Sequence, residues 1–379
     1  MKARLLFFAL SFAICSAVLP KAAAAEPMFT EMDLFISGHD HFNIYRIPSL
    51  IVAPSGTLLA FIEAREGDDG DPTDLALKRS AYTPPQPPRM LNGYPRVFGY
   101  GVNWEPLRIV LPGKGAAIMN PCPVLDQSTG RVWLPCYEVK GGLTEHLKDP
   151  YKGRVLLTWS DDEGATWAPP RDLTGELPRF ISGPGVGVQL RTGRLVIPGY
   201  WAPEPNVPSR SCVVYSDDHG ETWRRGAQVS GNTDESQAVE LSNGDLMLNC
   251  RSNRGKGCRY VALSCDGGQT WFEEYDEPAL PEPVCQGSIL RLPQSDAGSK
   301  PWLVFVNPTA GRTNLTVRLS TDDGKTWSVG RTVQPGPAAY TGMAFLKDGA
   351  IGVLYETGKM HPYEKVTFAR FNLEWLTGP

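Results

Sequence analysis

The chain has 379 residues, of which 41% are hydrophobic and 21% are charged, and its net charge is −4 at pH 7. It contains no long run of Lys and Arg, which argues against nucleic acid as its partner. The length is large for one ordinary core, although a repeated architecture can accommodate it as one domain.

The start of the chain predicts a secretory signal peptide at residues 1–25. A basic start is followed by an apolar segment at residues 5–19 and by three alanines that offer a cleavage site. The apolar segment is shorter than the ~20 residues of a membrane-spanning helix, and no later segment is apolar enough to span. We therefore expect residues 26–379 to form a secreted or periplasmic domain without stable membrane insertion.

Six stretches share one pattern, in which a short apolar strand, a Gly-containing turn and a second apolar strand follow one another. The first strands begin at Arg46, Asn120, Pro184, Ser236, Cys285 and Ala339, and the turns contain Gly56, Gly130, Gly193, Gly244, Gly298 and Gly349. A hairpin repeated in this way is typical of radial repeats, whose units pack against their neighbours. The sequence therefore predicts an all-β fold, a six-bladed β-propeller.

Four segments share the tighter motif S-x-D-x-G-x-T-W, and each follows an apolar strand. They lie at residues 160–167, 216–223, 264–271 and 320–327. The Asp carboxylate can accept backbone N–H bonds, Gly supplies a positive φ, Thr starts the next strand and Trp packs on the blade. Each copy has too few oxygen ligands for an EF-hand-like Ca²⁺ loop, so we interpret the motif as a structural turn between strands 3 and 4.

The last blade needs a strand from the start of the chain. Residues 366–372 supply its third strand, and the chain then ends. We expect residues 33–37 to supply the fourth strand, because this pairing removes the open edge of the sheet.

Strand 1 starts, strand 2 ends and strand 3 starts at one mouth of such a propeller, so functional side chains are expected there. The residues placed at this mouth are Arg46, Arg65, Glu235, Arg251, Arg312, Tyr340 and Glu356, together with the acidic loop at residues 66–74. Two arginines that share a face repel each other by roughly 4 kcal/mol at an effective dielectric constant near 20. A bound carboxylate offsets this cost, because guanidinium groups bind it bidentately.

These residues resemble those of the exo-α-sialidases (neuraminidases), whose turn motif is called the Asp box. The resemblance extends from about residue 43 to 372, with YRIP at residues 45–48, MNPCP at 119–123, NCRS at 249–252, CQGS at 285–288 and LYE at 354–356. The last four motifs are similar to the cytosolic-type animal enzymes, whereas the signal peptide and the many boxes resemble a secreted bacterial enzyme.

The resemblance implies retaining hydrolysis of terminal α-linked sialic acid from glycoproteins, gangliosides and oligosaccharides, without a cofactor. It assigns the sugar carboxylate to Arg46, Arg251 and Arg312, with Glu356 orienting the first of them. Tyr340 is then the nucleophile and Glu235 its general base. A neutral phenol suits this role, because the carboxylate on the anomeric carbon repels an anionic nucleophile.

The same resemblance places the acid/base residue in the acidic loop, where Asp69 matches best and Asp68 or Asp71 remain alternatives. It implies that Arg65 faces the 4-hydroxyl side. The expected contacts to the N-acetyl and glycerol groups are Met119, Glu145, Tyr200 and Gln286. The animal-type pattern has a second Tyr where this chain has Ala202, which leaves the leaving-group preference open.

Cysteine and histidine residues give weaker signals. Seven cysteines follow the signal peptide, and Cys250 and Cys258 flank one loop and can form a disulfide. The five histidines are scattered and lack the partners of a zinc set, so we expect no metal site.

Three alternative functions remain at this stage. A trans-sialidase shares the chemistry as far as the tyrosyl intermediate. A sialic-acid-binding lectin on the same propeller is expected to lose Tyr340, Glu235 or the loop Asp, all of which are present. A scaffold built from Asp-box turns leaves the three arginines unexplained.

Overall fold

The computed structural model describes residues 26–68, 71–81, 103–141, 153–202, 207–293, 301–328 and 330–378, and the backbone of residues 89–91 and 94–96. Regular structure in this part of the chain is almost entirely β-strand, and its one α-helix is α2 (Leu373–Thr377). The predicted all-β class is confirmed.

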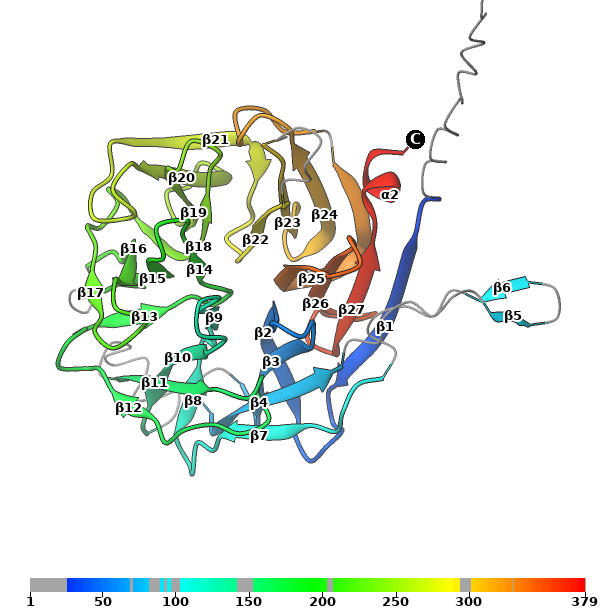
Figure 1. Cartoon of the computed structure of the whole chain (residues 1–379), viewed down its shortest axis with the longest axis horizontal. Helices are drawn as coiled ribbons and strands as arrows, with labels where there is room; N and C mark the ends of the chain where they lie inside the picture. Colours follow the sequence, from blue (N-terminus) through cyan, green and yellow to red (C-terminus); the bar gives the residue numbers. More distant parts are fainter. Residues whose placement is uncertain are drawn as a thin grey trace, which may run out of the picture.

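The larger sheets follow one another around a common centre in the order of the sequence (Figure 1). The nine-stranded sheet contains β2 (Ile44–Val52), β3 (Leu58–Arg65), β4 (Thr73–Ser80), β7 (Arg108–Leu111), β8 (Ala117–Met119), β9 (Val124–Leu125), β10 (Val132–Val139), β11 (Arg154–Ser160) and β12 (Arg171–Asp172). The five-stranded sheet contains β13 (Phe180–Ser182), β14 (Val188–Gln189), β15 (Leu195–Trp201), β16 (Arg210–Ser216) and β17 (Arg224–Arg225).

The remaining sheets continue the same order. The four-stranded sheet contains β18 (Thr233–Glu240), β19 (Leu246–Ser252), β20 (Cys258–Ser264) and β21 (Glu273–Pro281). The seven-stranded sheet contains β22 (Ser288–Arg291), β23 (Leu303–Pro308), β24 (Thr313–Ser320), β25 (Arg331–Phe345), β26 (Ile351–Thr357), β27 (Lys365–Phe371) and β1 (Phe29–Ile36). A separate hairpin pairs β5 (Arg89–Leu91) with β6 (Tyr94–Arg96).

The N-terminal strand closes the last sheet, as predicted. β1 pairs antiparallel with β27, from Phe29 opposite Phe371 to Ile36 opposite Lys365 (Figure 1). The strand begins earlier than residue 33, and its Phe35 is fully buried. Burial of this side chain adds to the backbone hydrogen bonds that hold the first strand to the last.

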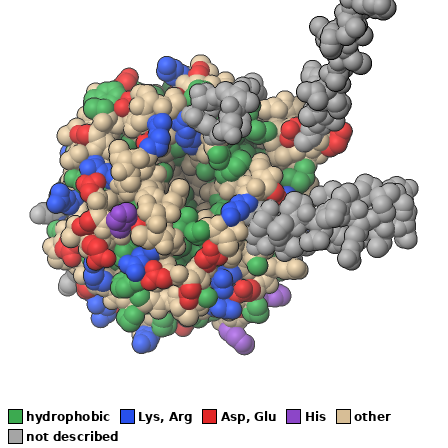
Figure 2. Space-filling view, viewed as in Figure 1, with side chains coloured by type: hydrophobic (Ala, Val, Ile, Leu, Met, Phe, Trp, Pro, Cys, Tyr) green, Lys and Arg blue, Asp and Glu red, His purple; other side chains and the backbone are tan. Residues whose placement is uncertain are grey.

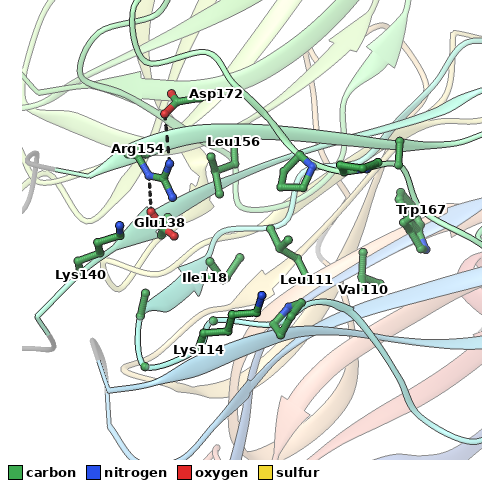
Figure 3. Close-up of a pocket in the computed structure, with 17 residues that line it drawn as sticks. Val110, Leu111, Lys114, Ile118, Glu138, Lys140, Arg154, Leu156, Trp167 and Asp172 are labelled. Atoms are coloured by element: carbon green, nitrogen blue, oxygen red, sulfur yellow. Dashed lines mark hydrogen bonds and ion pairs between the residues drawn. The ribbon is translucent and has the colours of Figure 1, made fainter.

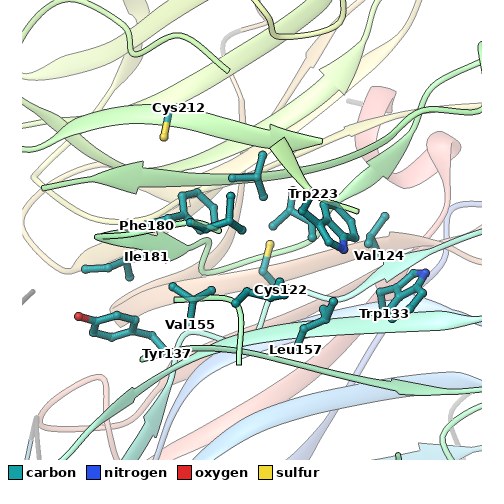
Figure 4. Packing of buried hydrophobic residues seen from close by; sticks show 14 of the residues in the cluster. Cys122, Val124, Trp133, Tyr137, Val155, Leu157, Phe180, Ile181, Cys212 and Trp223 are labelled. Atoms are coloured by element: carbon teal, nitrogen blue, oxygen red, sulfur yellow. The ribbon is translucent and has the colours of Figure 1, made fainter. Parts of the chain in front are cut away.

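The core lies between neighbouring sheets. Figure 4 shows one such cluster, in which Trp133 and Val155 of the nine-stranded sheet face Phe180 and Cys212 of the five-stranded sheet. Both faces of the inner strands are therefore covered, and all eight residues of β3 are buried. This explains why these strands are apolar without strict alternation.

The four S-x-D-x-G-x-T-W turns have one structure. In the first of them, Asp162 accepts hydrogen bonds from the backbone N–H of Thr166 (2.8 Å) and from its hydroxyl (2.6 Å). The Ser160 hydroxyl accepts from Gly164 N–H at 2.8 Å, and Gly164 has a φ of 79°. The Thr closes the turn on the Asp and does not start the next strand, which corrects one detail of the prediction.

These turns also join consecutive sheets. The turn glycine of the five-stranded sheet, Gly220, has a φ of 90°, and a Cβ there would lie 2.3 Å from Cε2 of Trp133 in the preceding sheet. Trp133 Nε1 donates to His219 O in the same turn. Glycine is therefore required at this position both for its backbone conformation and for the close approach.

The disulfide predicted between Cys250 and Cys258 is not formed. Cys250 lies opposite Tyr260 in the pairing of β19 with β20, whereas Cys258 lies opposite Pro281. All seven cysteines of the described chain are free, and of these Cys265 is exposed.

The described residues contain neither a metal-ligand cluster nor a membrane-spanning helix. They contain no group of three or more His, Cys, Asp or Glu side chains that could hold a metal ion. None of their helices is long and apolar enough to cross a membrane. Figure 2 shows acidic and basic side chains interspersed over the face seen down the shortest axis.

Candidate active site

A cavity of about 270 Å³ lies where the larger sheets meet. Its walls are formed by Arg46, Ile47, Arg65, Met119, Asn120, Tyr137, Ile181, Tyr200, Glu235, Arg251, Arg312, Tyr340 and Tyr363. Eight of the residues predicted for the site are among them. They come from strand ends and connecting loops that are distant in sequence, which agrees with the expected mouth of a radial repeat.

β-Bulges direct three of these side chains toward the cavity. The strand pairing shifts register between Arg46 and Ser49 in β2, between Thr233 and Ser236 in β18, and between Ala338 and Thr341 in β25. A bulge bends its strand and changes the direction of a side chain. The irregular segments contain Arg46, Glu235 and Tyr340.

Tyr340, Glu235 and Arg251 form a tight hydrogen-bonded group. The Tyr340 hydroxyl donates to Glu235 Oε1 at 2.5 Å. Arg251 Nη1 donates to Glu235 Oε2 at 2.6 Å and to Tyr340 Oη at 2.9 Å. The phenol therefore has a carboxylate to receive its proton and a guanidinium to stabilise the negative charge that then develops on its oxygen.

The environment favours the neutral form of Tyr340. Burial, followed by the charge of Glu235, raises the pKa of its phenol well above the usual range. Burial opposes the charge of Arg251, but Glu235, Tyr340 and Asp234 outweigh it and raise the pKa of the guanidinium. Attack by this oxygen would therefore require a base that removes the phenol proton.

Glu356 holds Arg46 in place from behind. Its Oε1 accepts hydrogen bonds from Arg46 Nε and from Ile47 N–H, both at 2.8 Å. Its Oε2 accepts from the backbone N–H of Tyr340 at 3.2 Å. The carboxylate is fully buried, so the ion pair connects β26 to β2 and to the strand that carries Tyr340.

Tyr363 is a cavity residue that the sequence analysis did not identify. Its ring centroid lies 3.9 Å from Cζ of Arg46, and its hydroxyl accepts a hydrogen bond from Arg312 Nη1 at 2.7 Å. It belongs to the loop between strands β26 and β27. The strand pattern predicts that this loop lies at the mouth, but it does not distinguish Tyr363 from the other loop residues.

Asp234 was also not identified. It forms an ion pair with Arg251 Nε at 3.5 Å and accepts from Asn253 Nδ2 at 2.7 Å. Burial has the largest effect and raises the pKa of this carboxyl to about 6. The charge of Arg251 lowers the pKa, whereas the charge of Glu235 raises it. Arg251 therefore lies between two carboxylates on one bulged strand.

Arg65 also lines the cavity and pairs with a second buried glutamate, Glu63. Its Nε donates to Glu63 Oε2 at 2.9 Å, and Glu63 Oε1 accepts from Asn120 N–H at 2.6 Å. Asn120 adopts a positive φ of 57° beside Met119. This glutamate fixes both the arginine and the strand end that carries Met119.

The prediction that Gln286 contacts the substrate is corrected by its position. Gln286 is buried and does not line the cavity. Its Nε2 donates to Thr341 O at 3.0 Å and its Oε1 accepts from Thr341 N–H at 2.9 Å. The amide of Gln286 is thus hydrogen-bonded to the backbone next to Tyr340, and it supports that strand.

Two predicted residues, Asp69 and Glu145, lie outside the described residues. Of the alternatives in the acidic loop, Asp71 Oδ2 accepts from Asp68 N–H at 2.9 Å. Asp74 lies in β4, where it accepts from Gly113 N–H at 2.8 Å. Asp71 therefore supports the backbone of the loop, and the assignment of the acid/base residue stays a prediction.

A larger cavity of about 830 Å³ lies elsewhere, between β7 and β12 (Figure 3). Arg154 lies there between two carboxylates and pairs with Glu138 Oε2 at 2.5 Å and with Asp172 Oδ2 at 3.4 Å. No residue predicted for the site lines this cavity. We therefore assign the candidate active site to the smaller cavity.

The chain is similar to known proteins over most of its length. A family model described as a BNR repeat-like domain matches residues 56–353. The chain is 35% identical to a sialidase of Micromonospora viridifaciens, over 95% of this chain and 56% of that protein. It is 32% identical to an exo-alpha-sialidase of Aspergillus fumigatus, over 96% of this chain and 95% of that protein.

Among solved structures, a Hadza microbial sialidase superposes with a TM-score of 0.78 at 28% identity, over 92% of this chain and 69% of that one. The chain therefore belongs to the sialidase family with BNR repeats, and its all-β fold is a β-propeller. It spans 56% of the Micromonospora sialidase and 62% of a Bacteroides fragilis sialidase, so these relatives contain residues that it does not match.

Proposed function

We propose that this protein is a retaining exo-α-sialidase that removes terminal sialic acid from glycoproteins, gangliosides and oligosaccharides. The observation that carries the proposal is the hydrogen bond from Tyr340 Oη to Glu235 Oε1, in a cavity that four arginines line. The relatives named as sialidases support it over most of the chain.

In the proposed reaction, Arg46, Arg251 and Arg312 bind the carboxylate of the sugar. Because that carboxylate lies on the anomeric carbon, binding it also fixes the carbon beside Tyr340. Their charge further stabilises the oxocarbenium-like transition state by holding the carboxylate in place.

The first step forms a covalent intermediate. Tyr340 Oη attacks the anomeric carbon, the bond from that carbon to the aglycone oxygen breaks, and Glu235 accepts the phenol proton. An acid, which the resemblance assigns to Asp69, protonates the leaving oxygen. In the second step, water gives a proton to the same acid and attacks the anomeric carbon, and Tyr340 leaves with the proton held by Glu235. Two displacements retain the anomeric configuration.

The proposal includes an architecture and a location. We assign six blades, with their first strands at β2, β9, β14, β18, β22 and the second half of β25. The support is that β25 pairs with β24 through residues 331–337 and with β26 through residues 338–345, so that one long strand joins two blades. We further propose that residues 26–379 act as one catalytic domain outside the cytoplasm, after removal of residues 1–25.

The test is hydrolysis of a fluorogenic α-sialoside, with NMR detection of the first anomer released. We expect the α-anomer of sialic acid, and release of the β-anomer first contradicts the tyrosyl route. Tyr340→Phe should lower kcat at least ~10³-fold and change the affinity for free sialic acid less than threefold, because it removes a group used in the transition state. Equal losses of turnover and binding argue against the nucleophile. Products in which sialic acid is transferred to a sugar or to its own hydroxyl favour the trans-sialidase alternative.

A further inference from the structure

The position of Tyr363 indicates a function in binding that the three arginines do not account for. Its ring covers the guanidinium of Arg46, with 3.9 Å between the ring centroid and Cζ. Its hydroxyl accepts from Arg312 Nη1 at 2.7 Å. One side chain therefore contacts two of the four arginines that line the cavity.

The two arginines need such a contact when no ligand is bound. Burial and, more weakly, the charge of Arg46 lower the pKa of the Arg312 guanidinium, but Cys285, Tyr340 and Tyr363 outweigh them and raise it above its usual range. Arg46 has Glu356 as its counter-ion, but Arg312 has no ion pair among the described residues. The negative face of the Tyr363 ring attracts Arg46, and its hydroxyl oxygen attracts Arg312.

The hydroxyl group of Tyr363 can also donate one hydrogen bond. Its oxygen accepts from an arginine, and an arginine donates only, so the O–H hydrogen of Tyr363 has to find another acceptor. None of the described residues accepts it. Because Tyr363 lines the cavity, a carboxylate oxygen held by the same arginines is the nearest suitable acceptor.

The loop that carries Tyr363 is built to hold it still. Glu364 accepts hydrogen bonds from the backbone N–H groups of Lys359 (3.0 Å), Met360 (2.7 Å) and His361 (3.2 Å). These bonds lower the pKa of the Glu364 carboxyl to about 2, so it stays ionised at neutral pH. Ser37 Oγ donates to Tyr363 O at 2.8 Å and fixes the loop from the other side.

We infer that Tyr363 is a fourth carboxylate-binding residue, which holds Arg46 and Arg312 apart in the empty cavity and donates its O–H to the bound carboxylate. The inference rests on the proposed function, since that function supplies the carboxylate. It makes Tyr363 a determinant of affinity for the anionic sugar and assigns it no part in proton transfer.

The experiment compares the wild-type protein with Tyr363→Phe, Tyr363→Leu and the control Tyr275→Phe, which removes a phenol oxygen from β21, away from the cavity. With a fluorogenic α-sialoside, Tyr363→Phe should raise KM about tenfold, or about 1.4 kcal/mol. Its kcat should stay within about twofold, since a contact equal in substrate and transition state changes KM alone. Tyr363→Leu should raise KM about threefold further, because the ring is lost as well. The control should match the wild type.

Three outcomes overturn the inference: an unchanged KM in Tyr363→Phe, a fall of kcat without a change in KM, or a drop in Tm that accounts for the loss of activity. Calorimetric titration with free sialic acid separates this inference from the proposed function. If the wild type binds without turnover, the hydrolase proposal fails, and a Kd about tenfold weaker in Tyr363→Phe still supports the fourth ligand. If the wild type does not bind, both fail.

Discussion

Replacement of Glu356 by Gln tests whether the buried ion pair with Arg46 supports the site. The variant keeps the volume of the side chain but removes the charge that faces Arg46 Nε at 2.8 Å. Glu356 is fully buried and Arg46 nearly so, and breaking such a pair by removing one partner typically costs about 3–5 kcal/mol. Since Arg46 reaches the cavity and its water, we expect about 3 kcal/mol of the free energy of unfolding to be lost. In a domain of this size this lowers Tm by about 4 °C.

The double variant Arg46→Met with Glu356→Gln tests more directly whether the two charges are coupled. Most of the cost in either single variant comes from a charge left without its partner, so removal of both charges should recover at least about 1 kcal/mol relative to the sum of the two single losses. Urea and thermal unfolding measure all four proteins of this cycle. Activity should stay low in the double variant, because it lacks Arg46, which we propose binds the carboxylate of the sugar. Additive losses of stability refute the argument, since they show that the pair is not coupled.

The remaining predictions concern the turns, the response to acid and the thiols. Asp218→Ala removes the acceptor of Thr222 N–H (2.9 Å) and Thr222 Oγ1–H (2.6 Å), and we expect a loss of about 1–3 kcal/mol in unfolding free energy with unchanged KM; a raised KM contradicts a structural turn. The carboxyls of the four turns (Asp162, Asp218, Asp266 and Asp322) have pKa values below the usual range, because hydrogen bonds from Thr and Ser outweigh the opposing effect of burial. Their contribution to stability is complete above the unfolded pKa of about 3.9, and it is lost as the pH falls through the lower pKa values of the folded state. Thermal unfolding measured from pH 7 to 2 should therefore show that Tm decreases below about pH 4. A decrease centred at pH 6 assigns acid unfolding to other groups. Iodoacetamide should label Cys265 and none of the six buried cysteines of the native domain, as read by mass spectrometry, and a reductant should leave Tm unchanged.

The repeated pattern predicted the parts of the fold that depend on local chemistry. Five of the six turn glycines, all but Gly298, lie among the described residues and have φ between 79° and 99°. The Asp–Thr hydrogen bonds follow from residue types at fixed spacing. The rule that strand 1 starts and strand 2 ends at one mouth placed Arg46 and Arg251 in the same cavity.

The remaining features depend on register and on loop conformation, which residue types do not encode locally. Asp234 and Glu235 are neighbours and should point to opposite faces of a regular strand, yet both contact Arg251 because β18 is bulged. Gln286 lies just before β22, but its amide is hydrogen-bonded to the backbone of Thr341. Tyr363 has no motif around it, and the three backbone bonds to Glu364 become evident only when the loop is folded.

The pairing of β1 with β27 also determines when the molecule can finish folding. A growing chain releases Phe29 long before its partner Phe371, so every intermediate that lacks residue 371 has an unpaired first strand. Such an edge can pair wrongly with other chains until its partner arrives. The entropic cost of joining two strands so far apart grows only with the logarithm of the length of chain between them. Contacts between distant parts of a chain nevertheless form slowly, so we expect β1 to pair with β27 late in folding. The candidate active site takes Arg46 from β2 and Tyr340 from β25, so its cavity is complete only after both strands have been synthesised.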